Sequence, residues 1–268
     1  MLQGKTALVT GSVRGIGESV ARALAAKGCN IMLNGLGEPD EVERTRASIA
    51  KDYGVRVVYH GADLAKRADI EDMMQAVERE FGGLNILINN AVIRYYKLIP
   101  DFDPDQWDHA MAVNVTAPFN LCRLALPMLR KAGWGRVINL SSTMGLAGRS
   151  GRVDYITSKH AMIGLTRAVA AETLRDPDIT CNALCPGSVL TPFIRARIQG
   201  LADARGISWD EMAVQYRKDV GQDSDFITPE RMAAIMVFLC SDDAKDISAV
   251  ALSVDSGRAG TWMEPVGG

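Results

Sequence analysis

The 268-residue sequence lacks the features of a membrane, secreted or nucleic-acid-binding protein. No apolar run reaches the roughly 18–20 residues that span a bilayer, so we expect no membrane segment. The opening residues MLQGKTALVTG lead directly into a predicted strand, without the basic and apolar stretches of a secretory signal. Positive charge is not in excess, because 30 Lys and Arg face 32 Asp and Glu. A nucleic-acid partner is therefore not expected.

Cysteine is scarce, and none of the five cysteines forms a C-x-x-C pair. Cys181 and Cys185 lie in the run ITCNALCP. If this run is a strand, they are about 13 Å apart, which is too far for a disulfide. We therefore expect reduced, mostly buried thiols and a cytoplasmic protein.

Motifs of hydrolases and metal sites are also missing. There is no G-x-S-x-G turn, which argues against a serine hydrolase. The alternating aspartates of residues 101–105 imitate the start of a calcium loop, but the glycine and glutamate that such a loop needs further on are absent. The three histidines have no metal-ligand spacing. We expect no bound metal.

What the sequence does contain is a regular alternation of short apolar runs and longer amphipathic stretches. The predicted strands are Thr6–Thr10, Asn30–Asn34, Val55–His60, Ile86–Asn89, Arg136–Leu140, Ile179–Leu184 and Val250–Val254. The predicted helices are Gly17–Lys27, Asp40–Tyr53, Ala68–Phe81, Gln106–Leu129, Tyr155–Leu174 and Pro229–Cys240. The strand runs are apolar throughout, which is typical of strands covered by helices on both faces. We predict an α/β fold with one Rossmann-type, doubly wound parallel sheet of about seven strands.

No linker rich in Pro, Gly or Ser divides the chain, so we predict one domain over residues 1–258 and a C-terminal tail over 259–268. Between Ser188 and Thr228, about forty residues have helical character but contain no predicted strand. A long insertion after the carboxyl end of a parallel strand is a common place for a segment that covers the substrate. We interpret residues 188–228 as a substrate lid.

A glycine-rich turn, Thr10–Gly17 (TGSVRGIG), follows the first predicted strand and opens the first predicted helix. Glycines let the backbone approach a pyrophosphate, and a helix N-terminus offers free N–H groups. The spacing differs from the common G-x-G-x-x-G, and an ordinary strand-to-helix turn is the alternative. The position in an N-terminal βαβ unit favours dinucleotide binding.

A second signal is the pair Tyr155 and Lys159, which share one helix face at a spacing of four. A nearby ammonium favours the phenolate form of a tyrosine and makes it a usable general base. Taken alone, this spacing is more typical of an ordinary surface pair.

Taken together, these motifs resemble the short-chain dehydrogenase/reductase family over roughly Leu2–Gly257. The matching residues are Thr10–Gly17, Asp63-Leu64, Asn89-Asn90-Ala91, Asn114, Ser142, Tyr155, Lys159, Pro186-Gly187 and Thr191. Within the family, the chain looks most similar to D-3-hydroxybutyrate dehydrogenases, through the segments NGLGEP (34–39), GWGR (133–136) and ITCNA (179–183).

The resemblance implies an oxidoreductase in which Tyr155 transfers the substrate proton and Lys159 holds the nicotinamide ribose. It implies that Ser142 bonds the reacting oxygen and that Asn114 holds a water of a proton relay. Asp63 would bind the adenine, and Asn90 would lie at the adenosine-side ribose. The implied cofactor-binding residues are Gly11, Ser12, Arg14, Gly15, Ile16, Gly17, Leu36, Asp63, Leu64, Asn90, Ala91, Tyr155, Lys159, Pro186, Gly187, Val189 and Thr191.

The sequence departs from the family pattern at Val92 and at Ser256, where the family usually has glycine; these changes put substrate fit in doubt more than reaction type. The choice of cofactor is open, because the second strand is followed by Asn34-Gly-Leu-Gly, which offers neither the acid that favours NAD nor the arginine that favours NADP. Arg14 is a candidate partner for a 2′-phosphate or a solvated surface residue. The resemblance favours NAD, with NADP as the alternative.

Candidate substrate-binding residues are Arg94, Met144, Arg152, Arg195 and Arg197, and Arg149 lies near them in sequence. The planar guanidinium suits a carboxylate or sulfonate. We therefore expect a small anionic hydroxy or keto compound; the alternative is that several of these arginines simply face solvent. Other functions left open are an NADPH-dependent reductase of a neutral ketone or 3-oxoacyl thioester, and a non-catalytic dinucleotide-binding sensor.

Self-association as a homotetramer is expected from the resemblance. Apolar residues on two predicted helices are compatible either with a subunit interface or with the core of one chain. They are Leu121, Leu124, Ala125, Met128, Ile163, Ala170 and Ala171.

Overall fold

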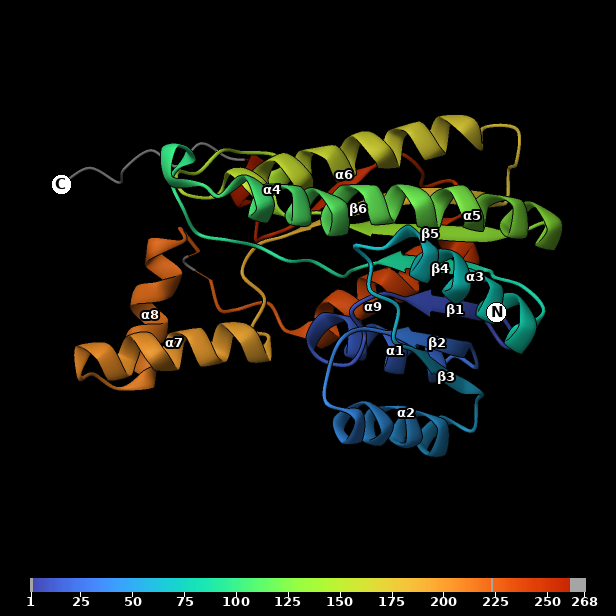
Figure 1. Ribbon diagram of the computed structural model, residues 1–268, viewed down its shortest axis with the longest axis horizontal. Coiled ribbons are helices and arrows are strands. Elements are labelled where there is room, and N and C mark those ends of the chain that lie inside the picture. The colour runs from blue at the N-terminus through green and yellow to red at the C-terminus, as the bar shows by residue number, and fades with distance from the viewer. Residues whose placement is uncertain (1, 223, 261–268) are drawn as a thin grey trace.

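The structure, a computed structural model, describes residues 2–222 and 224–260. Its centre is a sheet of seven parallel strands in the order β3-β2-β1-β4-β5-β6-β7 (Figure 1). The strands are β1 (Thr6–Val9), β2 (Asn30–Asn34), β3 (Val57–His60), β4 (Ile86–Asn89), β5 (Gly135–Leu140), β6 (Ile179–Pro186) and β7 (Ala251–Val254). The order of winding reverses between β1 and β4, and ligands of such sheets bind at the carboxyl ends beside this reversal.

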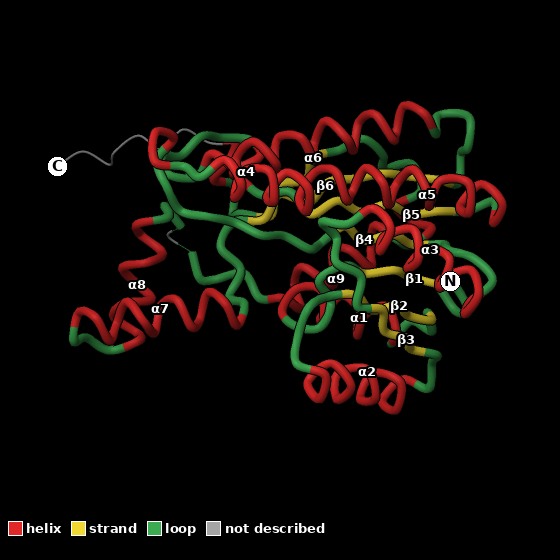
Figure 2. The backbone as a smooth tube through the Cα atoms, in the orientation of Figure 1, coloured by secondary structure: helices red, strands yellow, loops and turns green. Residues whose placement is uncertain are grey.

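Helices cover both faces of the sheet, as the predicted doubly wound fold requires (Figure 2). The α-helices of the described residues are α1 (Gly15–Ala25), α2 (Pro39–Tyr53), α3 (Arg67–Phe81), α4 (Pro104–Met111), α5 (Ala117–Ala132), α6 (Val153–Glu172), α7 (Pro192–Arg205), α8 (Trp209–Asp219) and α9 (Pro229–Leu239). Side chains of α1 and α9 belong to the core on one face, and those of α3, α5 and α6 to the core on the other. The predicted fold class is therefore confirmed.

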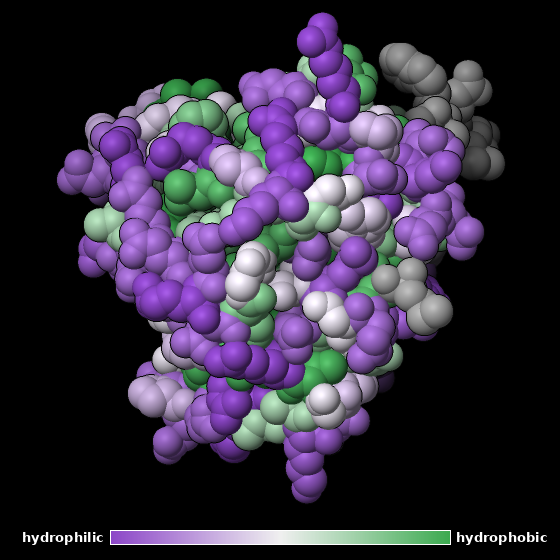
Figure 3. All heavy atoms as spheres, turned by 90° about the vertical axis from the view of Figure 1, so that its right-hand side faces the viewer, coloured by the Kyte–Doolittle hydropathy of each residue, from purple (hydrophilic) through white to green (hydrophobic). Residues whose placement is uncertain are grey.

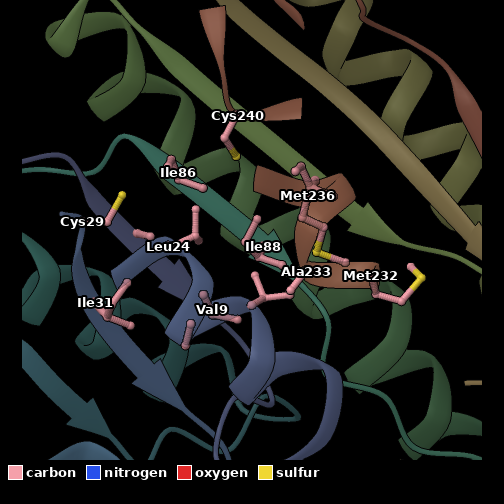
Figure 4. Close-up of a cluster of buried hydrophobic side chains, with 14 of the residues drawn as sticks. Val9, Leu24, Cys29, Ile31, Ile86, Ile88, Met232, Ala233, Met236 and Cys240 are labelled. Atoms are coloured by element: carbon pink, nitrogen blue, oxygen red, sulfur yellow. The ribbon is translucent and has the colours of Figure 1, made fainter. Parts of the chain in front are cut away.

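The first strand shows why the strand runs are apolar throughout. Val9 packs with Leu24 of α1 and Met236 of α9 in one core (Figure 4), whereas its neighbour Leu8 belongs to the opposite core with Met73 of α3. All of these side chains are buried. Since both faces of the sheet are covered, successive side chains both enter apolar surroundings, and the period-two polar pattern is lost.

The predicted continuous helix Gln106–Leu129 is wrong in one respect. The chain forms α4, then a π-helical segment at Ala112–Thr116, then α5. A π-helical turn inserts one residue without breaking the run of helical hydrogen bonds, so the apolar pattern gives no sign of it. This segment contains Asn114, whose side chain is turned inward and buried.

The predicted lid range, residues 188–228, contains α7 and α8, which lie beyond the carboxyl ends of the strands, on the left of Figure 1. Ile198 and Met212 pack in a small apolar cluster of their own between these helices. An isolated bridge between Val189 and Ile227 joins the two ends of the segment. Of the predicted tail, residues 261–268 lie outside the described part of the chain.

All five cysteines are free and buried, as predicted. Four of the apolar residues considered for a subunit interface, Leu121, Ala125, Ile163 and Ala170, are buried within the single chain, so they give no support to a tetramer. Within residues 2–222 and 224–260, no helix is long and apolar enough to cross a membrane, and no cluster of side chains has the composition of a metal site. The face at the amino ends of the strands is mainly hydrophilic (Figure 3).

Candidate active site

The glycine turn between β1 and α1 has a backbone that only glycine accepts easily. Gly11 and Gly15 have φ of +61° and +64°. A Cβ on Gly17 would clash with the carbonyl oxygen of Gly11, and a Cβ on Gly11 would come within 2.9 Å of Ala91 Cα. The turn is therefore closed tightly on itself and on the end of β4, which leaves an open backbone surface at the N-terminus of α1.

Asn90, at the end of β4, holds this turn in place. Its Nδ2 donates to the carbonyl oxygens of Thr10 (2.8 Å) and Gly11 (3.0 Å). The Thr10 hydroxyl in turn accepts from the backbone N–H groups of Asn90 and Ala91. The Asn90 amide nitrogen is thus committed to the turn, and only its carbonyl oxygen is left for the predicted contact near the adenosine ribose.

Residues 34–37, at the end of β2 and directly after it, carry no charged side chain. Asn34 is buried, and its Nδ2 donates to the carbonyl oxygens of His60 and Ala62, while its backbone N–H donates to Ser12 Oγ. Leu36 is 67% exposed, and Arg14, at the N-terminal end of α1, is exposed. The structure offers no acid here for a ribose hydroxyl, and Arg14 is the cation of the glycine turn.

The turn at Pro186–Thr191 lies beside the glycine turn. A Cβ on Gly15 would be 3.7 Å from Thr191, which places the two turns in van der Waals contact distance. Thr191 Oγ1 accepts from the N–H of Ile194 and caps α7. Gln222, a buried residue that the sequence did not single out, fixes the turn by accepting from the N–H of Ser188 at 2.7 Å.

These features fit a dinucleotide. A glycine-closed turn and a helix N-terminus form the surface for a pyrophosphate, and the Pro186–Thr191 turn continues this surface toward α6. Asp63, which the resemblance assigns to the adenine, lies in the loop between β3 and α3, and its Oδ1 accepts from the N–H of Ala65. Leu64 beside it is buried.

Tyr155 and Lys159 lie one turn apart on α6. The Lys159 ammonium is 5.4 Å from the centre of the Tyr155 ring and donates to the carbonyl oxygen of Leu140 at 2.6 Å. Lys159 is 3% exposed. Burial, and after it the positive charge of Arg94, lower the pKa of Lys159 from its usual 10.5 to about 7. At neutral pH, Lys159 is therefore only partly protonated. A ligand that accepts hydrogen bonds from its ammonium would raise the protonated fraction.

Ser142 follows β5 and its hydroxyl oxygen accepts from the N–H of Met144 at 3.2 Å. Because the oxygen is the acceptor in this bond, its proton remains free to donate to a substrate. Asn114 makes two bonds with Ile93, accepting from its N–H (2.9 Å) and donating to its carbonyl oxygen (2.8 Å). The π-helical segment thus anchors the loop after β4 next to α6.

Three of the candidate arginines converge on Tyr155 and on a second tyrosine, Tyr96. The Arg94 guanidinium carbon lies 5.7 Å from the centre of the Tyr155 ring, and that of Arg152 lies 5.0 Å from it. Arg152 and Arg197 lie over the Tyr96 ring at 4.0 and 4.2 Å. The Nε atoms of Arg152 and Arg197 are buried without a hydrogen-bond partner. We call Arg94, Arg152 and Arg197 the arginine cluster.

The other candidates lie differently. Arg195 is exposed and sits over Trp209 of α8 at 5.3 Å, and Arg149 donates to the carbonyl oxygen of Asp219. Met144 remains beside Ser142. The sequence analysis did not identify Tyr96 and Phe193, the aromatic residues against which the arginine cluster packs. The available signal was the run Arg94-Tyr-Tyr96.

Asp154 was also missed. It is fully buried, and its Oδ2 accepts from the N–H of Tyr95 at 2.9 Å, while Oδ1 has no partner. This bond ties the loop that carries Arg94 and Tyr96 to the helix that carries Tyr155. Asp154 therefore holds the loop with Arg94 and Tyr96 against α6, which carries Tyr155.

Comparison with known proteins agrees with this geometry. The short chain dehydrogenase family matches residues 5–201. D-beta-hydroxybutyrate dehydrogenases of Cupriavidus necator and Rhizobium meliloti are 42% and 40% identical over 257 and 253 residues, with 96% and 94% of this chain and 98% of each relative covered. A structure of L-sorbose reductase from Gluconobacter frateurii, complexed with NADPH and L-sorbose, superimposes with a TM-score of 0.92 at 28% identity, covering 97% of this chain and 98% of that one.

The predicted resemblance is thereby confirmed. The match covers most of the chain, and the relatives are similar over nearly their full length. The chain belongs to the short-chain dehydrogenase/reductase family and is an oxidoreductase that acts on CH–OH groups with a nicotinamide dinucleotide.

Proposed function

We propose that the protein transfers hydride between NAD(H) and a small anionic hydroxy or keto compound, of which 3-hydroxybutyrate is the simplest example. The observation that carries this proposal is the pair of guanidinium groups of Arg94 and Arg152 beside the Tyr155 ring. Two cations next to the reacting group favour a substrate whose acid lies close to its hydroxyl carbon. The similarity to D-beta-hydroxybutyrate dehydrogenases supports the same substrate class.

In the oxidation direction, Tyr155 as phenolate takes the proton of the substrate hydroxyl, while the free hydroxyl proton of Ser142 bonds the same oxygen. A nicotinamide dinucleotide held by the glycine turn and the Pro186–Thr191 turn would supply the hydride acceptor. Lys159, as an ammonium, stabilises the phenolate from one helical turn away. In the reduction direction, Tyr155 returns the proton. Asn114 holds the loop after β4 in place; the water that the family resemblance assigns to it is part of this proposal.

The proposed assignment of NAD rests on the lack of a cation in residues 34–43, from the end of β2 onward. A 2′-phosphate requires cations, and Arg14 alone is available at the glycine turn. The relatives named as hydroxybutyrate dehydrogenases support NAD, whereas the NADPH complex of L-sorbose reductase supports the alternative. Affinities for NADH and NADPH, measured by the fluorescence of the reduced nicotinamide, separate the two, and tighter binding of NADPH would overturn the assignment.

The substrate class is tested by an assay at the absorbance band of reduced nicotinamide with hydroxy acids, sulfonates, sugars and simple alcohols. We expect the hydroxy acids to have the highest kcat/KM. Arg152→Ala should raise the KM for every acidic substrate about 10-fold or more, because a charge-assisted contact is lost. If the KM for acidic substrates is unchanged, or if neutral ketones or thioesters are preferred, the protein is the neutral-carbonyl reductase instead.

A non-catalytic sensor would bind the cofactor but turn over none of these compounds. Support for turnover comes from α6, which carries Tyr155 and Lys159: Asn114 donates to Ser158 of this helix, and Ser141, next to Ser142, donates to the carbonyl oxygen of Lys159. A homotetramer and a cytoplasmic location stay predictions; light scattering in solution tests the first.

A further inference from the structure

We propose that the natural substrate carries two acid groups, and that Arg197 of α7 binds the second one. This inference rests on the proposed function, because it assumes a hydroxy or keto acid at Tyr155. It goes further by assigning the substrate a second negative charge at the side of residues 188–228.

The arginine cluster has two parts. Arg94 and Arg152 flank the reactive Tyr155, whereas Arg197 lies over Tyr96 and is carried by α7. Because Arg152 and Arg197 both lie over the Tyr96 ring, their guanidinium carbons are at most about 8 Å apart. One small molecule can therefore reach both parts, with one acid group beside the reacting carbon and the other toward α7.

The charges around the cluster do not balance. Within residues 2–222 and 224–260, none of the three arginines forms an ion pair with a carboxylate. The buried carboxylate that adjoins them along the chain is that of Asp154. Three guanidiniums against one carboxylate leave a surplus of two positive charges. Two negative charges on the substrate would neutralise it, and a single one would not.

Unpartnered hydrogen-bond donors in the arginine cluster also favour two acid groups on the substrate. The Nε–H groups of Arg152 and Arg197 are buried and have no acceptor, one in each part of the cluster. A buried donor without a partner is costly, so each part needs an acceptor of its own. Tyr216 of α8 is close enough for the arginines to affect its titration; burial raises its pKa despite them, so it stays a neutral phenol and supplies no negative charge.

The test compares three substrates that share the same reacting carbon, the third of them used as both enantiomers. They are 3-hydroxybutyrate, 3-hydroxyglutarate, and both enantiomers of the monomethyl ester of 3-hydroxyglutarate, which keeps the length but has one charge. We expect kcat/KM for the diacid to exceed that for either ester about 10- to 100-fold, the range of one charge-assisted contact. The ester controls for size, so a preference for the diacid reports charge.

Arg197→Met should lower the ratio of kcat/KM between diacid and ester by the same 10- to 100-fold. Arg205→Met is the matched control, because Arg205 is also a cation of α7 but bonds Gln215, away from the cluster. It should leave the ratio unchanged. Thermal melting checks that both variants fold; if Arg197→Met does not fold, Arg197→Gln removes the charge but keeps a polar side chain, and the ratio should fall in the same way.

The outcomes separate this inference from the proposed function. If 3-hydroxybutyrate and the ester are used as well as the diacid, or if Arg197→Met leaves the ratio intact, the second acid site is overturned while the proposed function stands. If none of the three acids is turned over although a neutral carbonyl compound is, the proposed function falls and this inference falls with it.

Discussion

The proposed cofactor side, at the glycine turn, and the proposed substrate side, at the arginine cluster, are built by opposite means. On the cofactor side, polar groups bond each other: Asn90 holds the glycine turn, and Ser12 and Asn34 are bonded to one another and to the backbone. On the substrate side, three arginines rest on aromatic rings, and two of them have unpartnered donors. The first region is complete without a ligand, because it binds through backbone shape. The second is left with unpaired charge, because it binds through charge that the substrate completes.

The largest effect is expected from the Tyr155 hydroxyl, the group at which the cofactor side and the substrate side act together. Tyr155→Phe deletes the hydroxyl that moves the proton and leaves the ring on which Arg94 and Arg152 rest. We expect kcat to fall about 10²–10⁴-fold, as for loss of a general base. Turnover at the parental rate would refute the mechanism. Titration of NADH fluorescence is the control and should show that the variant still binds cofactor.

The cofactor side should be sensitive to shape alone. Gly17→Ala places a Cβ against the carbonyl oxygen of Gly11, so the turn must open. We expect NADH binding to weaken about 10-fold or more and the free energy of unfolding to fall by about 1–3 kcal/mol. Gly54→Ala is the control: unlike the helical Gly17, Gly54 has a positive φ and lies in open space at the end of α2, so its cost in stability is backbone strain and should come without any loss of cofactor affinity.

The same contrast explains how far the sequence could predict the molecule. Strand runs and the glycine turn are local patterns, and the fold that they predict is confirmed. The break at Asn114 could not be predicted, because the helical hydrogen bonding continues through the π-helical turn and a shift of one residue does not mark its place in the apolar pattern. The sequence nominated Arg94, Arg195 and Arg197 alike. Only the direction of each side chain in space separates Arg197, over Tyr96, from Arg195, over Trp209, and sequence spacing does not contain it.

Between the two sides lies Lys159, and its burial should make the stability of the cofactor-free protein depend on pH. The folded-state pKa is lowered to about 7, below the unfolded value of about 10.4, so between these values the unfolded chain holds more protons. The contribution of Lys159 to the free energy of unfolding should therefore rise with pH, by about 1–2 kcal/mol from pH 7 to 8.5. Denaturant titrations across this range measure it.

Lys159→Met should remove this rise, since the buried methionine has no proton to lose. The Lys159 contribution is measured as the difference between the parent and Lys159→Met, because burial raises the pKa of all five cysteines, which opposes the rise in both proteins as the unfolded thiols ionise. An unchanged slope in Lys159→Met would show that Lys159 is not the group responsible.

The smallest effect should come from Ser256, at the edge of the cleft, where the family pattern has glycine. Ser256 has φ of +61°, a left-handed conformation that costs a residue with a Cβ about 1–2 kcal/mol. Its hydroxyl bonds Ser224 at an exposed position, which offsets little. Ser256→Gly removes the strain but gains unfolded-state entropy, so the free energy of unfolding should rise by only about 0.5–1 kcal/mol. Ala249→Gly, with φ of +64° outside the cleft, should gain a similar amount. If kcat/KM changes in Ser256→Gly and not in Ala249→Gly, Ser256 affects the substrate site as well as the backbone. The strained backbone at Ser256 is then part of the substrate side.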